Sequence, residues 1–310
     1  MHRSLLRLSL LSLAACVGDL TPGATKAPVD RPPDEPVKPP IEVAIAPAQV
    51  RVLSAPEYRN TIRDLLGLTV SLTLTHADWT GGFDNGAAIQ VDENLFSALL
   101  TEGEALAQQY VATRLAGDFP CFDPAAISDA CVRTVISQLG RRAYRRPLTA
   151  TQADELFTFF EGVGDRPLGV EWLITRLITS PQLLYRTEVG QRVQAGSDRF
   201  ALDDFEKASL IAYTLTGTMP DEALLADAEA GLLDDAHLRA HVRRLWAAPR
   251  TRERQAGFFR QWLKVTTLDQ MARQPADFVK LTAPEQGRSL KAEFDAYVGA
   301  VIFDGTGTLP

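Results

Sequence analysis

A polar, glycine-rich segment at residues 78–86 carries the residue types best suited to hold a ligand. Its sequence is Asp78-Trp79-Thr80-Gly81-Gly82-Phe83-Asp84-Asn85-Gly86. Carboxylate and amide oxygens are the ligands that Ca²⁺ prefers, and the ring of Trp79 or Phe83 can pack against a sugar or a peptide. The spacing differs from that of an EF-hand loop. Because glycines, Asp84 and Asn85 also suit tight turns, we expect a structural turn, with calcium binding and sugar or peptide contact as the two functional alternatives.

Four arginines cluster at the end of a predicted helix, at positions Arg141, Arg142, Arg145 and Arg146. Residues four apart lie on one helix face, so the cluster divides into two pairs. Cations favour the carboxyl end of a helix, and Pro147 cannot continue it. The cluster could bind an anion or an acidic partner. We favour a junction between helical modules, at which some of these arginines pair with buried carboxylates.

His237 and His241 lie four residues apart on another predicted helix, a spacing at which two histidines can share a metal ion. Residues 238–240 are Leu-Arg-Ala and lack the glutamate of the zinc-protease motif, so we expect a solvated helix face and no metal or cofactor. The chain has no Gly-x-Ser-x-Gly motif and no phosphate-binding glycine loop. The two carboxylates of a glycoside hydrolase are recognised by their separation in the folded protein, which the sequence does not show. The sequence therefore leaves enzymatic activity undecided.

The first sixteen residues have the layout of a secretory signal peptide. A short basic start is followed by an apolar run, Leu8 to Ala15, that is too short to span a bilayer. Residues 13–16, Leu-Ala-Ala-Cys, resemble the lipobox of bacterial lipoproteins, in which the cysteine is acylated after cleavage. We therefore predict a signal peptide at 1–15 and a lipid-anchored Cys16.

Residues 16–47 predict a disordered tether. Eight prolines and few large apolar side chains occur between residues 17 and 47, so the segment cannot offset the entropy of ordering.

The net charge of −7 argues against a nucleic-acid partner. Cys121 and Cys131 are the remaining cysteines, and an even pair in an exported protein predicts a disulfide, with free or metal-bound thiols as the alternative.

Apolar spacing after the tether is helical almost throughout. Capping boxes pair Ser54 with Glu57, Thr149 with Gln152, and Asp203 with Glu206. An apolar stripe marks the final helix at Phe294, Tyr297, Val298, Val301 and Ile302. The only weak strand candidate is Val70 to Leu74. We predict an all-α fold of two packed helical bundles that divide near residues 190–200.

Several segments resemble one family of proteins. The arginine-rich segment is the most specific of them, and the full set comprises residues 57–67, 82–85, 140–149, 183–186, 217–221 and 261–263. They resemble the envelope proteins of planctomycetes and myxobacteria that are built from serial domains of unknown function, numbered 1587, 1595 and 1592. The resemblance places 1587-like and 1595-like modules in residues 48–190 and a 1592-like module in residues 198–310.

The resemblance implies a location rather than a reaction, and it assigns no catalytic residue. Some relatives carry c-type cytochrome modules, whereas this chain lacks a Cys-x-x-Cys-His motif. Because relatives continue into further modules, we expect the last module to be incomplete.

These observations predict a non-catalytic binding or scaffold component of a cell-envelope assembly, beside c-type cytochrome partners. It would be lipid-anchored at the outer membrane or the periplasmic face, and an envelope protein or a polysaccharide would be its further partner. The alternative is a hydrolase or oxidoreductase that acts on extracellular polymer, with Asp84 or another acid taking part.

Overall fold

The computed structural model of the chain describes residues 49–70, 79–80, 83–84, 86, 89, 91–197, 199–268 and 282–305. The predicted signal peptide, Cys16 and the Pro-rich tether lie outside these residues. The described part is predominantly α-helical, which confirms the predicted fold class. None of its helices is both long and apolar enough to cross a bilayer.

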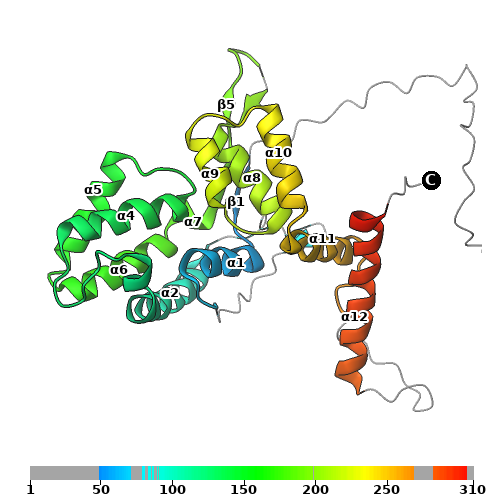
Figure 1. Ribbon diagram of the computed structural model, residues 1–310, viewed down its shortest axis with the longest axis horizontal. Helices are drawn as coiled ribbons and strands as arrows, with labels where there is room; N and C mark the ends of the chain where they lie inside the picture. Colours follow the sequence, from blue (N-terminus) through cyan, green and yellow to red (C-terminus); the bar gives the residue numbers. More distant parts are fainter. Residues whose placement is uncertain are drawn as a thin grey trace, which may run out of the picture. The chain divides into compact units, whose positions relative to one another are not determined.

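The first group of helices builds the larger hydrophobic core. Helix α2 packs on α6, α6 also packs on α5, and α4 packs on α5 (Figure 1). The core includes Tyr58, Tyr110, Ile136, Phe160 and Leu173, each at most 2% exposed. The helices are α1 (Ala55–Leu66), α2 (Glu93–Thr113), α3 (Leu115–Asp118), α4 (Asp129–Tyr144), α5 (Ala150–Gly162), α6 (Arg166–Ile178) and α7 (Pro181–Leu184).

The second group has a smaller core, in which Ala208, Ala212, Leu224 and Leu245 pack together. Its helices are α8 (Asp204–Thr216), α9 (Glu222–Glu229), α10 (Asp235–Trp246), α11 (Pro249–Trp262) and α12 (Ala283–Gly299), which continues into the π-helical turn η2 (Ala300–Asp304).

The predicted stripe on the last helix is only partly covered. Val298 is buried, whereas Tyr297 is 69% exposed and Val301 is 43% exposed. The turn η2 that follows the helix contacts its neighbours through the tilted ring pair of Phe303 and Trp246 and through an ion pair between Arg252 and Asp304.

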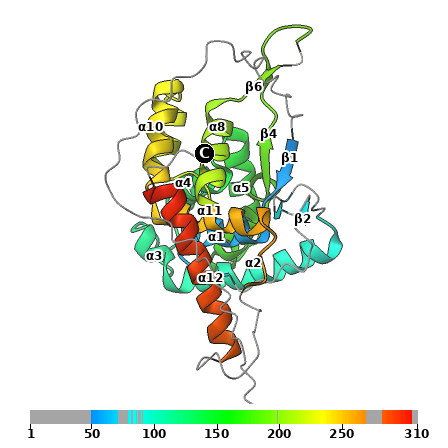
Figure 2. The ribbon, with the colours of Figure 1, turned by 90° about the vertical axis from the view of Figure 1, so that its right-hand side faces the viewer.

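Short antiparallel strand pairs supplement the helices without changing the all-α class. Strand β1 (Gln49–Val52) pairs with β4 (Tyr185–Glu188), with Arg51 opposite Arg186 (Figure 2). Strands β2 (Trp79–Thr80) and β3 (Phe83–Asp84) form a second pair, and β5 (Gln191–Arg192) and β6 (Phe200–Ala201) a third. Strands of two to four residues are too short to show the alternation of apolar and polar residues by which a strand is predicted from sequence. The segment proposed as a strand lies outside the described residues, apart from Val70, which is in no strand.

Local sequence signals position most helix starts. Thr149 and Gln152 form a capping box, as do Asp203 and Glu206. At the start of α1 the Glu57 carboxylate accepts a hydrogen bond from the Ser54 amide at 3.1 Å, as the sequence predicts. The predicted disulfide between Cys121 and Cys131 is confirmed, and it ties the segment after α3 to the first turn of α4.

Candidate functional site

Helix α1 has two different faces. Tyr58, Ile62, Leu65 and Leu66 are buried in the larger core. A second stripe, Glu57, Asn60, Thr61 and Asp64, repeats at the same helical spacing but is polar. Each of these four side chains contacts a residue that lies more than 120 positions further along the chain. The polar stripe is therefore where distant parts of the sequence meet.

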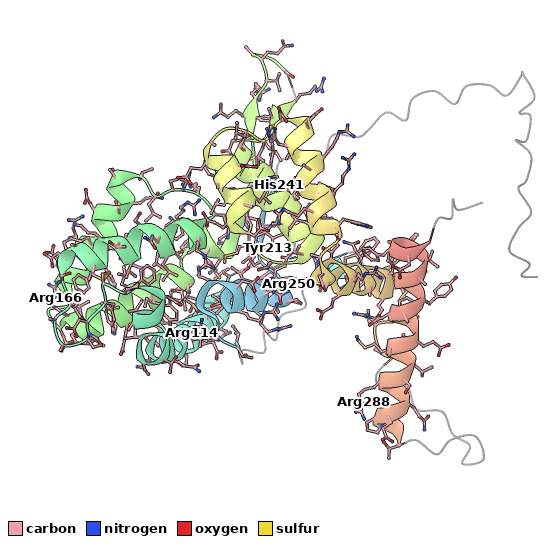
Figure 3. All side chains as sticks on the ribbon, in the orientation of Figure 1. Arg114, Arg166, Tyr213, His241, Arg250 and Arg288 are labelled. Atoms are coloured by element: carbon pink, nitrogen blue, oxygen red, sulfur yellow. A yellow bond between two sulfur atoms is a disulfide. The ribbon has the colours of Figure 1, made fainter. Side chains whose placement is uncertain are left out.

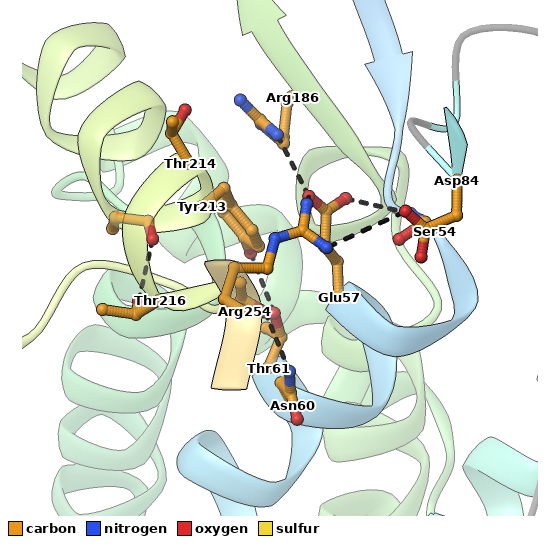
Figure 4. A network of polar contacts seen from close by, with 12 residues as sticks. Ser54, Glu57, Asn60, Thr61, Asp84, Arg186, Tyr213, Thr214, Thr216 and Arg254 are labelled. Carbon is orange, nitrogen blue, oxygen red and sulfur yellow. Dashed lines mark hydrogen bonds and ion pairs between the residues drawn. The ribbon is translucent and has the colours of Figure 1, made fainter. Parts of the chain in front are cut away.

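Glu57 is the more buried of the two acids in the stripe, with a side chain only 3% exposed against 23% for Asp64. Its Oε1 lies 3.3 Å from Arg186 on β4 and 3.3 Å from Arg254 on α11 (Figure 4). Its Oε2 accepts the hydrogen bond from the Ser54 amide. Both carboxylate oxygens are therefore engaged, and a residue expected to serve as a local helix cap also joins three elements.

Arg186 is fixed from several sides. Its side chain is 7% exposed, it also pairs with Glu188, and it lies 4.9 Å from the centre of the Tyr213 ring. Tyr213, on α8, shares a 2.9 Å hydrogen bond with the Thr61 hydroxyl (Figure 4). Tyr213 is completely buried, and burial raises the pKa of its hydroxyl. It packs in the larger core although it belongs to the second group of helices.

The carboxyl end of α1 carries a second ion pair. Asp64 forms a bidentate pair with Arg250, with one contact at 2.9 Å, and accepts a hydrogen bond from Thr218 at 2.7 Å. One turn earlier, Asn60 donates to the carbonyl of Gly217 at 3.1 Å. In Figure 3, Arg250 and Tyr213 lie where α8 and α11 approach α1. Burial alone would raise the pKa of Asp64, but hydrogen bonds from Arg250 and Thr218 and the charges of Arg250 and Arg63 outweigh it and lower the pKa.

Three of the four clustered arginines are committed to internal contacts. Arg141 pairs with Glu222 and Glu229, two residues of α9. Arg142 donates to the carbonyl oxygens of Asp64 and Leu65, which end α1 without an intrahelical partner.

Arg145 is buried and donates to the carbonyl oxygens of Gln182, Leu183 and Tyr185. Its backbone has φ 59°, the left-handed conformation that ends helix α4. Arg146 is exposed and lines a cavity of about 420 Å³ beside Tyr185 and Phe205. Of the four, only Arg146 has a side chain with no hydrogen bond or ion pair to the described residues, and its backbone amide donates to the carbonyl of Arg141.

The predicted ligand loop contributes two described side chains. The Asp84 amide donates to Gln261 Oε1 at 3.2 Å, and the Phe83 ring stacks on Phe258 at 5.5 Å between centroids. The Asp84 carboxylate lies 4.0 Å from Arg254. Of the other proposed loop residues, Trp79 lies in β2, and Asp78 and Asn85 fall outside the described residues.

These contacts border a cleft of about 480 Å³, which we call the junction cleft. Its lining comes from the first strands and α1, from β4, and from α8 and α11. The residues are Arg51, Glu57, Phe83, Asp84, Arg186, Glu188, Leu210, Tyr213, Thr214, Arg254, Gln255, Phe258 and Gln261. Phe258 is 44% exposed, so the cleft has an open aromatic wall.

The two histidines of α10 take separate partners. His237 pairs with Asp234 and His241 with Asp227, each at 2.8 Å. His241 is buried and also contacts Arg244, which pairs with Asp221. Within the described ranges, no group of three or more histidine, cysteine, aspartate or glutamate side chains is placed to hold a metal ion.

Sequence reasoning missed the arginines that make the site. Arg250 and Arg254 lie in an arginine-rich stretch with Arg252, and Arg186 lies in a short strand, but no local pattern indicates which acid each of them pairs with. Asn60 and Asp64 did carry a signal, because a polar stripe opposite an apolar one at the same helical spacing indicates a second buried face.

Comparison with protein families agrees with the order of segments along the chain. Residues 51–112 match the family described as Protein of unknown function (DUF1587), residues 131–188 match DUF1595 of the same description, and residues 202–309 match DUF1592. The chain belongs to the family of proteins built from these three domains in series. Searches of curated proteins and of solved structures each found no match.

The three domains of this family meet on the polar stripe of α1. Glu57, in the DUF1587 domain, contacts Arg186 of the DUF1595 domain and Arg254 of the DUF1592 domain. Asn60 reaches Gly217, and the Asp84 amide reaches Gln261. The segments by which the chain resembles its family are therefore the segments that contact one another.

We predict that Glu57→Gln lowers the free energy of unfolding by roughly 3–5 kcal/mol, because it leaves a buried and a largely buried guanidinium without their shared carboxylate. Urea unfolding, followed by circular dichroism, measures the change. The matched control is Asp154→Asn, which removes the exposed pair between Arg133 and Asp154 and should cost about 1 kcal/mol or less. Equal effects of the two substitutions would show that Glu57 does not organise the junction.

We also predict that Asp64 makes stability sensitive to acid. Its pKa in the folded chain lies below the ordinary value of 3.8, so the folded state binds this proton more weakly than the unfolded state does. The contribution is therefore present above about pH 4 and is lost as the pH falls through the folded pKa. Between about pH 5 and pH 2, the unfolding free energy of the wild-type chain should fall more steeply than that of Asp64→Asn. Parallel slopes in urea titrations would contradict the assignment.

Proposed function

We propose that this chain is a lipid-anchored, non-catalytic binding component of the cell envelope, and that the junction cleft is where it holds its ligand. The observation that carries the proposal is the convergence of all three domains on one open cleft with a polar floor and an aromatic wall. Ligand pockets of proteins typically measure roughly 300–1,000 Å³, and the junction cleft falls within that range.

The commitment of the charged side chains supports binding rather than catalysis. A general acid or a nucleophile needs an atom that can reach the substrate. Both Glu57 oxygens are engaged by Arg186, Arg254 and the Ser54 amide. The Asp84 carboxylate is accessible, with its side chain 18% exposed, and it would be the centre of the alternative, a hydrolase of extracellular polymer.

The location follows from the N-terminal sequence. The lipobox-like residues 13–16 and the Pro-rich tether would place the folded body near a membrane surface, beside the envelope proteins or polysaccharides with which it assembles. Because some proteins with this domain series carry c-type cytochrome modules, a separate c-type cytochrome is a further proposed partner.

We expect Cys16→Ser to release the chain from membranes while its body still folds. The reason is that acyl chains on Cys16 supply the membrane affinity, and no described helix can replace them. Radioactive palmitate labelling and membrane flotation measure the anchor, and circular dichroism reports the fold. Cys131→Ala is the matched cysteine control and should retain the label. Label that persists on the Cys16→Ser chain would refute the anchor.

The binding role is tested with polymer that contains no lipid. The full chain, purified in detergent, should sediment with detergent-extracted cell envelopes, and Asp84→Ala should reduce the bound fraction several-fold because its carboxylate faces the cleft. The control Trp172→Ala removes an exposed aromatic residue of α6 outside the cleft and should leave sedimentation unchanged.

Two results would overturn the proposal. Sedimentation unaffected by Asp84→Ala would place binding elsewhere on the molecule. Steady release of soluble fragments from the polymer by the wild-type chain, absent with Asp84→Ala, would establish the hydrolase instead.

A further inference from the structure

We infer that the ligand of the junction cleft is a neutral carbohydrate chain, an inference that rests on the binding function proposed above. The cleft offers balanced charge, hydrogen-bonding groups that remain open, and exposed aromatic rings. Together these features match the chemistry of a sugar, which combines hydroxyl groups with apolar C–H faces.

Charge balance argues against an ionic ligand. Three arginines and three acids line the cleft: Arg51, Arg186, Arg254, Glu57, Asp84 and Glu188. Arg186 pairs with Glu57 and Glu188, and Arg254 lies between Glu57 and Asp84. An anion would therefore meet arginines that are already neutralised, and a cation would meet neutralised carboxylates. An uncharged ligand avoids this penalty, because no charged group has to lose its hydration when the ligand enters the cleft.

Hydrogen-bonding capacity remains at the edge of the cleft. Gln261 uses its Oε1 to accept from the Asp84 amide, and its Nε2 donates to no described residue. The Asp84 carboxylate is 4.0 Å from Arg254, which is longer than a hydrogen bond, so its oxygens can still accept. A sugar hydroxyl both donates and accepts. One hydroxyl can therefore donate to Asp84 while a neighbouring one accepts from Gln261.

The aromatic wall supplies the apolar half of the match. Phe83 and Phe258 line the cleft, and Trp262 continues the row beyond the lining, with ring planes 16° apart in the first pair and 28° apart in the second. Phe258 is 44% exposed and Trp262 is 59% exposed. Side chains of this size are usually covered, and an exposed aromatic group beside polar side chains is typical of a binding surface. The C–H groups of successive sugar rings can pack against the exposed parts of this row while neighbouring hydroxyls reach Asp84 and Gln261.

The test uses the full chain in detergent and purified hexasaccharides of neutral β-linked glucose, mannose and N-acetylglucosamine, with hexagalacturonate as the anionic comparison. Isothermal titration calorimetry gives affinities, and tryptophan fluorescence reports contact near Trp262. At least one neutral hexasaccharide should bind more tightly than hexagalacturonate. Phe258→Ala and Gln261→Ala should each weaken that binding about tenfold, because the first removes an aromatic contact and the second removes a hydrogen-bond donor.

Trp172→Ala is the matched control, with a side chain 49% exposed on a different helix, and it should bind like wild type. Circular dichroism of each variant establishes that the fold is retained, and Gln261→Ala carries the test if Phe258→Ala is unfolded.

The outcomes separate this inference from the binding function on which it rests. Preference for hexagalacturonate, or neutral binding unchanged in both cleft variants, would overturn the carbohydrate assignment. Failure of every hexasaccharide, together with Asp84-dependent sedimentation on envelopes, would overturn the carbohydrate assignment and leave the binding function standing. Failure of both assays would overturn both.

Discussion

The arrangement of the chain depends on one buried carboxylate shared by two arginines. Glu57 is nearly inaccessible to solvent, yet it holds Arg186 from β4 and Arg254 from α11. A charge in such a place is tolerated only when its partners are present, because an unpaired buried ion loses its hydration without compensation. The first turn of α1 therefore requires the other two domains to lie where they do.

The rest of the polar stripe extends this requirement along the helix. A hydrophobic face would allow α1 to slide or rotate against its neighbours at small cost, since apolar packing is non-directional. Hydrogen bonds from Asn60 to Gly217 and from Thr218 to Asp64 fix both the rotation and the axial position of the helix. Buried polar contacts of this kind add little net stability compared with apolar packing, but they penalise the wrong arrangement heavily. In this chain their effect is to hold Asp84, Phe258 and Gln261 at one cleft.

Sequence patterns predicted the helices well and the site poorly, for a physical reason. Helix caps such as Asp203 with Glu206, and apolar stripes such as that of α1, are local, so three or four neighbouring residues define them. The disulfide was also predictable because only two cysteines remained after Cys16. The partners of Glu57 lie 129 and 197 residues away, and no local pattern encodes such a pairing. Resemblance to the domain family named the right segments, including residues 183–186 and 217–221, but it could not say which side chains meet.

The same contacts show that the three family domains share one hydrophobic core. The larger core takes residues from all three family matches, since Tyr58 and Leu106, Leu139 and Leu173, and Tyr213 and Met219 belong to one cluster. Tyr213 and Met219 lie beyond residues 190–200, where the sequence suggested that two bundles divide. An isolated DUF1592 segment would expose the Tyr213 ring, and an isolated DUF1587 segment would leave Glu57 without either arginine. Neither consequence is compatible with an independently stable unit, because each uncovers a large apolar surface or a buried charge. The serial domains are therefore units of sequence, whereas the smallest part that satisfies its own buried groups contains all three, and the junction cleft exists only in that assembly.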